Sequence, residues 1–321
     1  MRRAALPTTA LLLGALALAG CSGDGTTASP SSSDSPSASQ GTGEQTPATL
    51  SGDVPEEKLP TASGSFGEKP ELTFPSEEHL AEGAVKVLSE GDGEVVEAGE
   101  LLVANYLGQV WGGDVFDNSY DRGAPSAFPI GTGYVIKGWD DGLVGQKIGS
   151  RVLLSLPPSL GYGENGNPNA GIGGTDTIVF VVDLVASFDG SAGGQADATP
   201  GDELPAGGPQ VSGELGGPAT LTIPEGAEAP SEESVVVLAQ GSGETVAEGD
   251  SVVVQYAIQS FGEDEGYSTW ENGTPEQLTV QAGTPLAGLV GVPVGSRVFL
   301  SVPSSDQQTS FVAVMDLVAK L

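Results

Sequence analysis

The chain has 321 residues, a formal net charge of −32 at pH 7, one histidine and one cysteine. So large a negative charge repels phosphate backbones, and we therefore expect no nucleic-acid partner. One histidine and one cysteine argue against a Ser-His-Asp triad, a cysteine protease and a His/Cys zinc site, so we expect neither a metal nor a cofactor. Without a second cysteine there is no disulfide, and hydrophobic cores must hold the domains together.

The first twenty residues have the order of a secretory signal peptide. Arginines at 2–3 precede an apolar run over residues 11–18, which is too short for a spanning helix of about 20 apolar residues. The run ends in a Leu-Ala-Gly-Cys sequence that resembles the bacterial lipobox, in which the cysteine is acylated after cleavage. We predict that residues 1–20 are removed and that Cys21 anchors an extracytoplasmic protein to the cell membrane through lipid. The alternative is an ordinary signal peptide with a stray cysteine near its end.

Two stretches of low complexity divide the rest of the chain. Residues 21–65 are mostly Ser, Thr, Gly, Pro and Ala with scattered acids, so they cannot bury enough surface to offset chain entropy. We predict a disordered tether there, beginning at the lipidated Cys21, and a linker of similar composition over residues 189–216. The regions 66–188 and 217–321 are rich in apolar and β-branched residues and are predicted to be two domains.

The two predicted domains repeat each other in sequence. Val-Lys-Val-Leu at residues 85–88 returns 150 positions later as Val-Val-Val-Leu at residues 235–238. Further on, Gly-Ser-Arg-Val at residues 149–152 returns at residues 295–298. A period this long indicates duplicated domains rather than a solenoid repeat.

Strand signals dominate both domains. Short runs of β-branched and apolar residues bounded by Gly, Pro and Asp predict strands at Leu101–Tyr106, Arg151–Leu156 and Thr177–Leu184, and a final strand at Phe311–Val318. The one predicted helix is short, at Asp140–Lys147, with acids in its first turn and a lysine at its end, as the helix dipole favours. The predicted fold class is α+β, an antiparallel β-sheet wrapped on one short helix, in two tandem copies.

Aromatic residues are sparse in the chain, yet they cluster in the first domain beside glycines and turns. The segments that contain them are Asn105-Tyr106, Val115–Ser119, Phe128–Gly131, Val135–Leu143, Leu160–Gly163 and Val179-Phe180. With these motifs in this order, residues 101–185 resemble the FKBP family of prolyl isomerases, the immunophilins inhibited by tacrolimus and rapamycin. The resemblance implies a peptidyl-prolyl cis/trans isomerase in the first domain, proline-containing segments of exported proteins as substrates, and those two drugs as inhibitors.

The resemblance also implies a shallow apolar pocket and assigns its residues. Trp139 would form the floor, and Tyr106, Phe116 and Phe180 the walls that receive a proline ring. The remaining assigned positions are Asp117 beside the reacting bond, the Ile136 main-chain N–H and the Tyr162 hydroxyl as donors to peptide carbonyls, Val135 and Ile172 in the lining, and Ser126 and Asn167 at the rim, where known members often carry phenylalanine and histidine. Phe128 is expected in the core, and the alternative for the whole set is that these aromatics are only core.

Such a pocket suits the rotation of a prolyl amide bond. Breaking the resonance of that bond costs about 18–20 kcal/mol, and the twisted state has little charge separation across the C–N bond. Apolar surroundings therefore favour the twisted state over the planar one, which is differential binding of the transition state. No nucleophile or proton relay is needed, so a site without histidine can still catalyse this reaction.

The second domain keeps the sheet pattern but loses the pocket. Tyr256 matches Tyr106, whereas the alignment places Trp270 near Phe116, Glu271 at Asp117, Pro285 at Trp139 and Ala313 at Phe180. Because a fold can outlive its function, we expect a degenerate, inactive copy.

Two further interpretations stay open for the whole chain. The first is a non-catalytic peptide-binding chaperone or scaffold lipoprotein. The second is an adhesion or solute-binding lipoprotein. The last of these needs a cleft between two larger α/β lobes, which the sequence does not contain.

Overall fold

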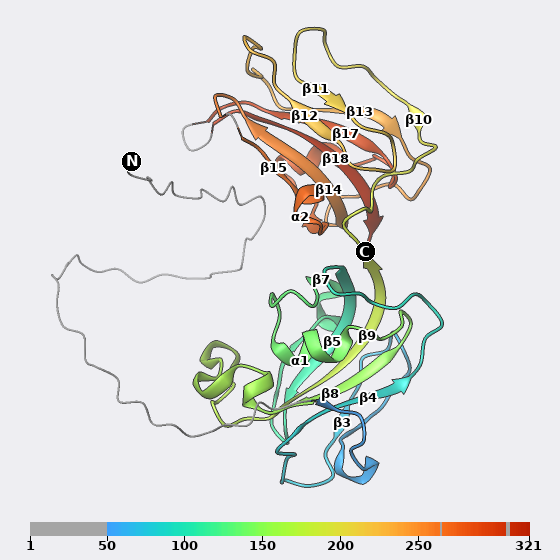
Figure 1. Ribbon diagram of the computed structural model, residues 1–321, viewed down its shortest axis with the longest axis vertical. Helices are drawn as coiled ribbons and strands as arrows, with labels where there is room; N and C mark the ends of the chain where they lie inside the picture. Colours follow the sequence, from blue (N-terminus) through green and yellow to red (C-terminus); the bar gives the residue numbers. More distant parts are fainter. Residues whose placement is uncertain (1–49, 264, 306–308) are drawn as a thin grey trace, which may run out of the picture. The chain divides into compact units, whose positions relative to one another are not determined.

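The computed structural model describes residues 50–263, 265–305 and 309–321 (Figure 1). The predicted signal peptide, Cys21 and the first part of the predicted tether lie outside the described residues. None of the helices in the described ranges has the length and apolar content of a membrane span.

The first sheet has seven strands in the order β1-β4-β8-β9-β5-β6, with β7 also paired to β5. All pairs are antiparallel except β1 with β4. The predicted mostly antiparallel arrangement is therefore what the structure has. Its strands are β1 (Leu50–Ser51), β4 (Gly83–Ser89), β5 (Leu101–Val110), β6 (Val115–Asn118), β7 (Ser126–Pro129), β8 (Arg151–Leu156) and β9 (Ile178–Phe188). Between β6 and β9 the helical elements are α1 (Lys137–Leu143) and four 3-10 turns, η2 (Tyr120–Arg122), η3 (Pro158–Leu160), η4 (Gly163–Asn165) and η5 (Pro168–Ala170).

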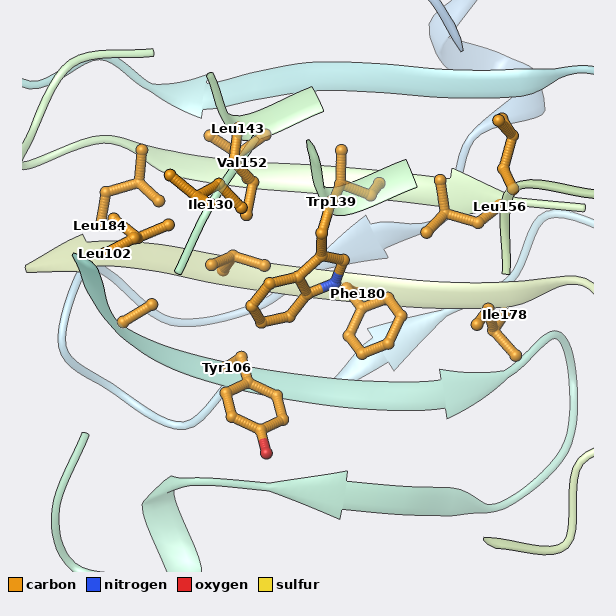
Figure 2. Close-up of a cluster of buried hydrophobic side chains, with 14 of the residues drawn as sticks. Leu102, Tyr106, Ile130, Trp139, Leu143, Val152, Leu156, Ile178, Phe180 and Leu184 are labelled. Atoms are coloured by element: carbon orange, nitrogen blue, oxygen red, sulfur yellow. The ribbon is translucent and has the colours of Figure 1, made fainter. Parts of the chain in front are cut away.

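Both faces of this sheet are covered. All six residues of β8 are buried, which is the pattern of a strand that has apolar groups packed on both sides. On one face, α1 packs through Trp139 and Leu143 against the sheet (Figure 2). On the other face, Leu153 and Val181 pack with Leu59, which comes from the segment preceding the sheet. The sheet therefore has two cores, and α1 lies over only one of them.

The helix begins and ends earlier than the sequence predicted. It covers Lys137–Leu143 instead of Asp140–Lys147, because Val144 is extended and Gly145 has a φ of 87°. The carboxylate of Asp140 does not cap this helix; it accepts two main-chain N–H groups of the preceding turn at 2.6 and 2.8 Å. Acidic residues at this position therefore stabilise a turn rather than mark the first turn of a helix.

The predicted disordered tether is wrong for residues 50–65. This segment contains β1, η1 (Glu56–Lys58) and β2 (Thr61–Ala62), and β2 pairs with β3 (Leu72–Thr73). Leu59 is 4% exposed, and the Arg151 guanidinium donates to the main-chain oxygen of Gly64 at 2.9 Å. A few apolar anchors and main-chain acceptors order this segment, although its average composition is that of a disordered chain.

The second sheet follows the same path as the first, β10-β13-β17-β18-β14-β15 with β16 paired to β14. The predicted linker at 189–216 contributes to it, because β10 pairs with β13. A separate two-stranded sheet, the β11–β12 hairpin, also begins inside that range. The first turn of this segment begins at Asp189, whose main-chain oxygen accepts from the Ala192 N–H at 3.2 Å. The linker prediction is therefore also wrong over most of its length. The elements are β10 (Thr199–Pro200), β11 (Gln210–Ser212), β12 (Thr220–Thr222), β13 (Ser234–Gln240), β14 (Ser251–Ser260), β15 (Tyr267–Ser268), α2 (Thr269–Asn272), β16 (Glu276–Thr279), η6 (Pro285–Leu289), β17 (Arg297–Val302) and β18 (Phe311–Lys320).

Strand register corrects one part of the sequence alignment. Gly108 pairs with Asp117 on β6, and Ile258, which lies 150 positions after Gly108, pairs with Tyr267 on β15. Tyr267 rather than Glu271 therefore holds the position of Asp117, and Trp270 lies beyond the Phe116 position. The alignment failed here because the two domains differ in length: equivalent residues are 150 positions apart in β5 and β14 but 146 apart at the Gly-Ser-Arg-Val motif. In the paired strands the alignment is right, since Gly108 pairs with Phe180 and Ile258 with Ala313.

Candidate active site

An open pocket of about 480 Å³ lies on the α1 face of the first sheet. Its floor is Trp139 on α1, with Tyr106 on β5 and Phe180 on β9 beside it (Figure 2). The remaining lining residues come from β6, β7, the turn before α1 and the loop between β8 and β9: Phe116, Asp117, Phe128, Tyr134, Val135, Ile136, Tyr162, Asn167, Asn169 and Ala170.

The aromatic rings meet edge to face around Trp139. Its ring centroid lies 5.4 Å from that of Tyr106, 5.1 Å from Phe128 and 5.3 Å from Phe180, with interplanar angles of 76–83°. Such edge-to-face pairs add about 0.5–1.5 kcal/mol each beyond the area they bury. Trp139 is 4% exposed, and its indole N–H has no acceptor among the described residues. The floor of the pocket is therefore an aromatic surface held by three ring contacts, with one buried N–H that has no acceptor among the described residues.

A glycine on β5 makes room for two of the walls. A Cβ on Gly108 would lie 2.6 Å from Phe116 Cζ and 2.7 Å from Phe180 Cε1, closer than real Cβ contacts come. The rings of Phe116 and Phe180 meet over it at 5.5 Å, nearly perpendicular. The residue type at 108 thus decides whether this wall can form.

A charged network closes one side of the pocket. The Tyr106 hydroxyl donates to Asp117 Oδ2, and the Arg122 guanidinium donates to Asp117 Oδ1 at 2.6 Å and to the Tyr106 oxygen at 2.8 Å. Both oxygens of Asp117 are therefore engaged, and its charge is balanced by Arg122. Sequence reasoning missed Arg122; the available signal was a cation five residues after Asp117, across the η2 turn.

The two groups that the resemblance assigned as donors to peptide carbonyls, the Ile136 main-chain N–H and the Tyr162 hydroxyl, belong to residues that line the pocket. The main chain of Ile136 is extended, and within the described residues no acceptor is found for its N–H. Tyr162, between η3 and η4, is 37% exposed, and burial of the rest of the side chain raises the pKa of its phenol. Both groups thus have protons to donate to a ligand in the pocket.

The structure brings most of the predicted residues together, with two exceptions. Ile172 does not line the pocket; it is 3% exposed and pairs through its main chain with Asn167. Ser126 does not line the pocket either, and its hydroxyl accepts a hydrogen bond from the Arg122 guanidinium at 3.3 Å. Phe128, expected only in the core, lines the pocket. The predicted residues in the lining are Tyr106, Phe116, Asp117, Val135, Ile136, Trp139, Tyr162, Asn167 and Phe180.

The second sheet has a different arrangement around its equivalent tyrosine. The Tyr256 hydroxyl donates to Glu276 Oε2 at 3.0 Å, and the Tyr267 hydroxyl donates to Glu276 Oε1 at 2.7 Å. Glu276 pairs with Val254 as Ser126 pairs with Ala104, so the carboxylate comes from a different strand than Asp117 does. Two phenols replace the phenol and guanidinium of the first sheet.

Alkaline pH is expected to destabilise the fold through its buried tyrosines. Burial raises the pKa of Tyr106, Tyr120 and Tyr256 above the ordinary value. The unfolded chain ionises these phenols near pH 10, whereas the folded chain keeps them neutral, so the stability that they contribute is complete below about pH 10 and is lost above it. Melting temperatures measured from about pH 9 to about pH 11 should fall, and less steeply for Tyr106→Phe. Parallel curves for the two proteins would contradict this assignment for Tyr106.

Comparisons with known proteins agree with this geometry. The sequence model of the FKBP-type peptidyl-prolyl cis-trans isomerase family matches residues 93–185. The chain is similar to an FK506-binding protein of Streptomyces anulatus, with 44% identity over 120 residues, which are 37% of this chain and 97% of that protein. It is also similar to the peptidyl-prolyl cis-trans isomerase Mip of Coxiella burnetii, with 39% identity over 35% of this chain and 48% of that protein, so it spans about half of that relative.

Crystal structures of AtFKBP13 and of FkpA from Escherichia coli share 34% and 41% identity with the chain, with TM-scores of 0.31 and 0.30. They cover 33% and 32% of this chain, and 93% and 46% of their own. From the family match and the Streptomyces relative, the chain belongs to the FKBP-type peptidyl-prolyl cis-trans isomerases, and residues 93–185 carry its isomerase domain.

Proposed function

We propose that the protein is a lipid-anchored isomerase that assists the folding of exported proteins outside the membrane, with one active domain followed by a degenerate copy. The observation that carries the catalytic part is the aromatic pocket over Trp139, closed on one side by Tyr106, Asp117 and Arg122. The anchor and the location are supported by the sequence before and at Cys21 alone.

The pocket acts by binding the twisted prolyl bond. A proline ring seated on Trp139 would be surrounded by ring edges, which favour the less dipolar twisted amide over the planar one. The Ile136 N–H and the Tyr162 hydroxyl would hold the neighbouring carbonyls and fix the chain on either side of the rotating bond. Asp117 is occupied by Tyr106 and Arg122, so it orients these groups instead of taking a proton.

The shared strand path and register of the two sheets support a duplicated fold. A second common feature lies at the start of each site: the Tyr106 N–H donates to the Ser119 hydroxyl at 2.9 Å, and the Tyr256 N–H donates to the Thr269 hydroxyl at 2.8 Å. Ala313 offers no ring where Phe180 forms a wall, so the second copy is inferred to be inactive.

A hollow in the second sheet favours a binding role for that copy. It has a volume of about 470 Å³ and is lined by apolar groups that include Val236, Phe261, Phe299 and Val312. This hollow supports the chaperone or scaffold interpretation alongside catalysis. If it binds clients, Trp139→Ala should still suppress the aggregation of an unfolded protein.

The direct test is the cis-to-trans rate of a chromogenic peptide containing Leu-Pro or Phe-Pro, measured with the full chain with and without rapamycin. Acceleration that the drug abolishes is the expected result. Acceleration without inhibition would keep the isomerase and indicate a pocket rim altered near Asn167. No acceleration by the folded protein would favour the non-catalytic peptide-binding chaperone or scaffold. Any fragment for this assay should begin at residue 50, because Arg151 binds Gly64 and β1 pairs within the sheet.

A further inference from the structure

The substrate of a prolyl isomerase is a polypeptide, so the residues on either side of the bound proline must extend across the rim of the pocket. Tyr134, at one side of that rim, lines the pocket and is 73% exposed, more than any other large apolar or aromatic side chain in the described ranges. Among the described residues, Tyr134 has no side-chain hydrogen bond and no aromatic-ring contact. An exposed ring at the exit of a peptide-binding pocket is placed to contact the residues that flank the proline.

The turn that carries Tyr134 is held firmly. Gly131 and Gly133 have φ values of 73° and 78°, and their N–H groups donate to the two oxygens of Asp140. A Cβ on Gly131 would lie 2.6 Å from Ala98 Cβ, so this turn also packs closely on the neighbouring loop. The main chain under Tyr134 is therefore fixed to α1, and the ring stands on a rigid base.

A second hollow adjoins the pocket at this turn. It has a volume of about 570 Å³ and shares Val135 with the aromatic pocket. Its charged lining consists of Asp140, Asp141 and Lys137, and Lys137 is paired with Asp141. The hollow therefore carries one net negative charge, on a protein whose overall charge is −32.

We propose that Tyr134 and the second hollow together form a subsite, here called the acidic subsite. This subsite selects substrates with a lysine or arginine near the isomerised proline. This inference rests on the proposed isomerase function. The face of an exposed tyrosine attracts a cation. The carboxylates of Asp140 and Asp141 in the adjoining hollow add a Coulomb attraction that falls as the salt concentration rises. The strongly acidic chain also draws basic segments toward it and disfavours acidic ones.

The test compares matched peptides that differ in one residue. Lysine, norleucine or glutamate is placed two or three residues before or after the proline, and kcat/KM is measured with the full chain. The lysine-to-norleucine ratio should be about three to ten at one of these positions and should fall at high salt. Because the ratio is internal to each protein, it is not affected by a variant that changes overall turnover.

Four variants distinguish the proposal from its alternatives. Tyr134→Ala should lower the ratio to the smaller value that the carboxylates alone give, and Tyr134→Phe should keep it, since the ring face remains. Asp141→Asn should lower the ratio, whereas Lys137→Gln should raise it by leaving Asp141 unpaired. A ratio of one in the unmodified protein, or a ratio that Tyr134→Ala leaves unchanged, overturns the subsite while the isomerase stands. Absence of turnover on every peptide would count against the isomerase and the subsite together.

Discussion

Replacing Trp139 by alanine should lower kcat/KM for a Leu-Pro peptide by at least tenfold, about 1.4 kcal/mol of transition-state binding. The indole forms the floor against which Tyr106, Phe128 and Phe180 pack, all within 5.1–5.4 Å between centroids. Without it the proline ring has no flat apolar surface, and the walls lose a shared partner. The measurement is the isomerisation rate of the full chain, with folding checked by its melting temperature and near-ultraviolet circular dichroism.

The second sheet supplies a matched control. Trp270 is buried to 9% exposure, and like Trp139 its indole N–H has no acceptor among the described residues. Trp270→Ala removes a comparable side chain from the other sheet, far in sequence from the pocket. It should leave the isomerisation rate within about twofold, which corresponds to less than about 0.5 kcal/mol of transition-state binding. Equal losses in the two variants would mean that both act through stability. Full activity in a folded Trp139→Ala protein would mean that this tryptophan is not part of the catalytic site.

The amino-acid sequence predicted those pocket residues that belong to motifs with a recognisable side-chain type and order along the chain. Trp139, Tyr106 and Phe180 fall in distinct motifs, and large rings beside glycines are uncommon enough to be recognised. Arg122 was missed because one arginine in a turn is ordinary, and only the fold brings it to Asp117. Ile172 was assigned to the lining from resemblance, whereas its main-chain bridge to Asn167 turns it into the core.

Composition failed where a few residues decide the structure. The segment over residues 50–65 looks disordered on average, yet Leu59 is buried, and the segment offers main-chain oxygens to a buried guanidinium. Residues 189–216 failed in the same way, since Gly194 donates to the buried Asp316. The repeated Gly-Ser-Arg-Val motif contained the missing signal, because its arginines require partners wherever they are buried.

Removing the carboxylate of Asp183 should be the most destabilising single change in the first sheet. Arg151 and Asp183 are 2% and 0% exposed, and the guanidinium donates to both carboxylate oxygens at 2.6 and 2.8 Å. Asp183 also accepts from the Gly67 N–H at 2.6 Å and the Tyr120 hydroxyl at 2.9 Å. Asp183→Ala leaves a buried cation and two donors without their acceptor, which should cost about 3–5 kcal/mol.

The same pair in the second sheet makes the test specific. Arg297 donates to Asp316 at 2.6 and 2.9 Å, and both residues are buried. Isomerase activity measured at increasing urea reports only on the first sheet if the second copy is inactive. Asp183→Ala should then lower the urea midpoint for activity by roughly 1.5–2 M, while Asp316→Ala should leave it unchanged.

Replacing both partners separates the charge from the packing. Arg151→Met with Asp183→Leu leaves no buried ion, so this double variant should be more stable than Asp183→Ala alone, although Gly64 loses the donor that Arg151 provided. If the double variant is no better, the hydrogen bonds to the segment over residues 50–68 outweigh the ion pair. If Asp316→Ala lowers the activity midpoint as much as Asp183→Ala does, the two sheets unfold as one cooperative unit, and the duplicated ion pairs stabilise a single structure.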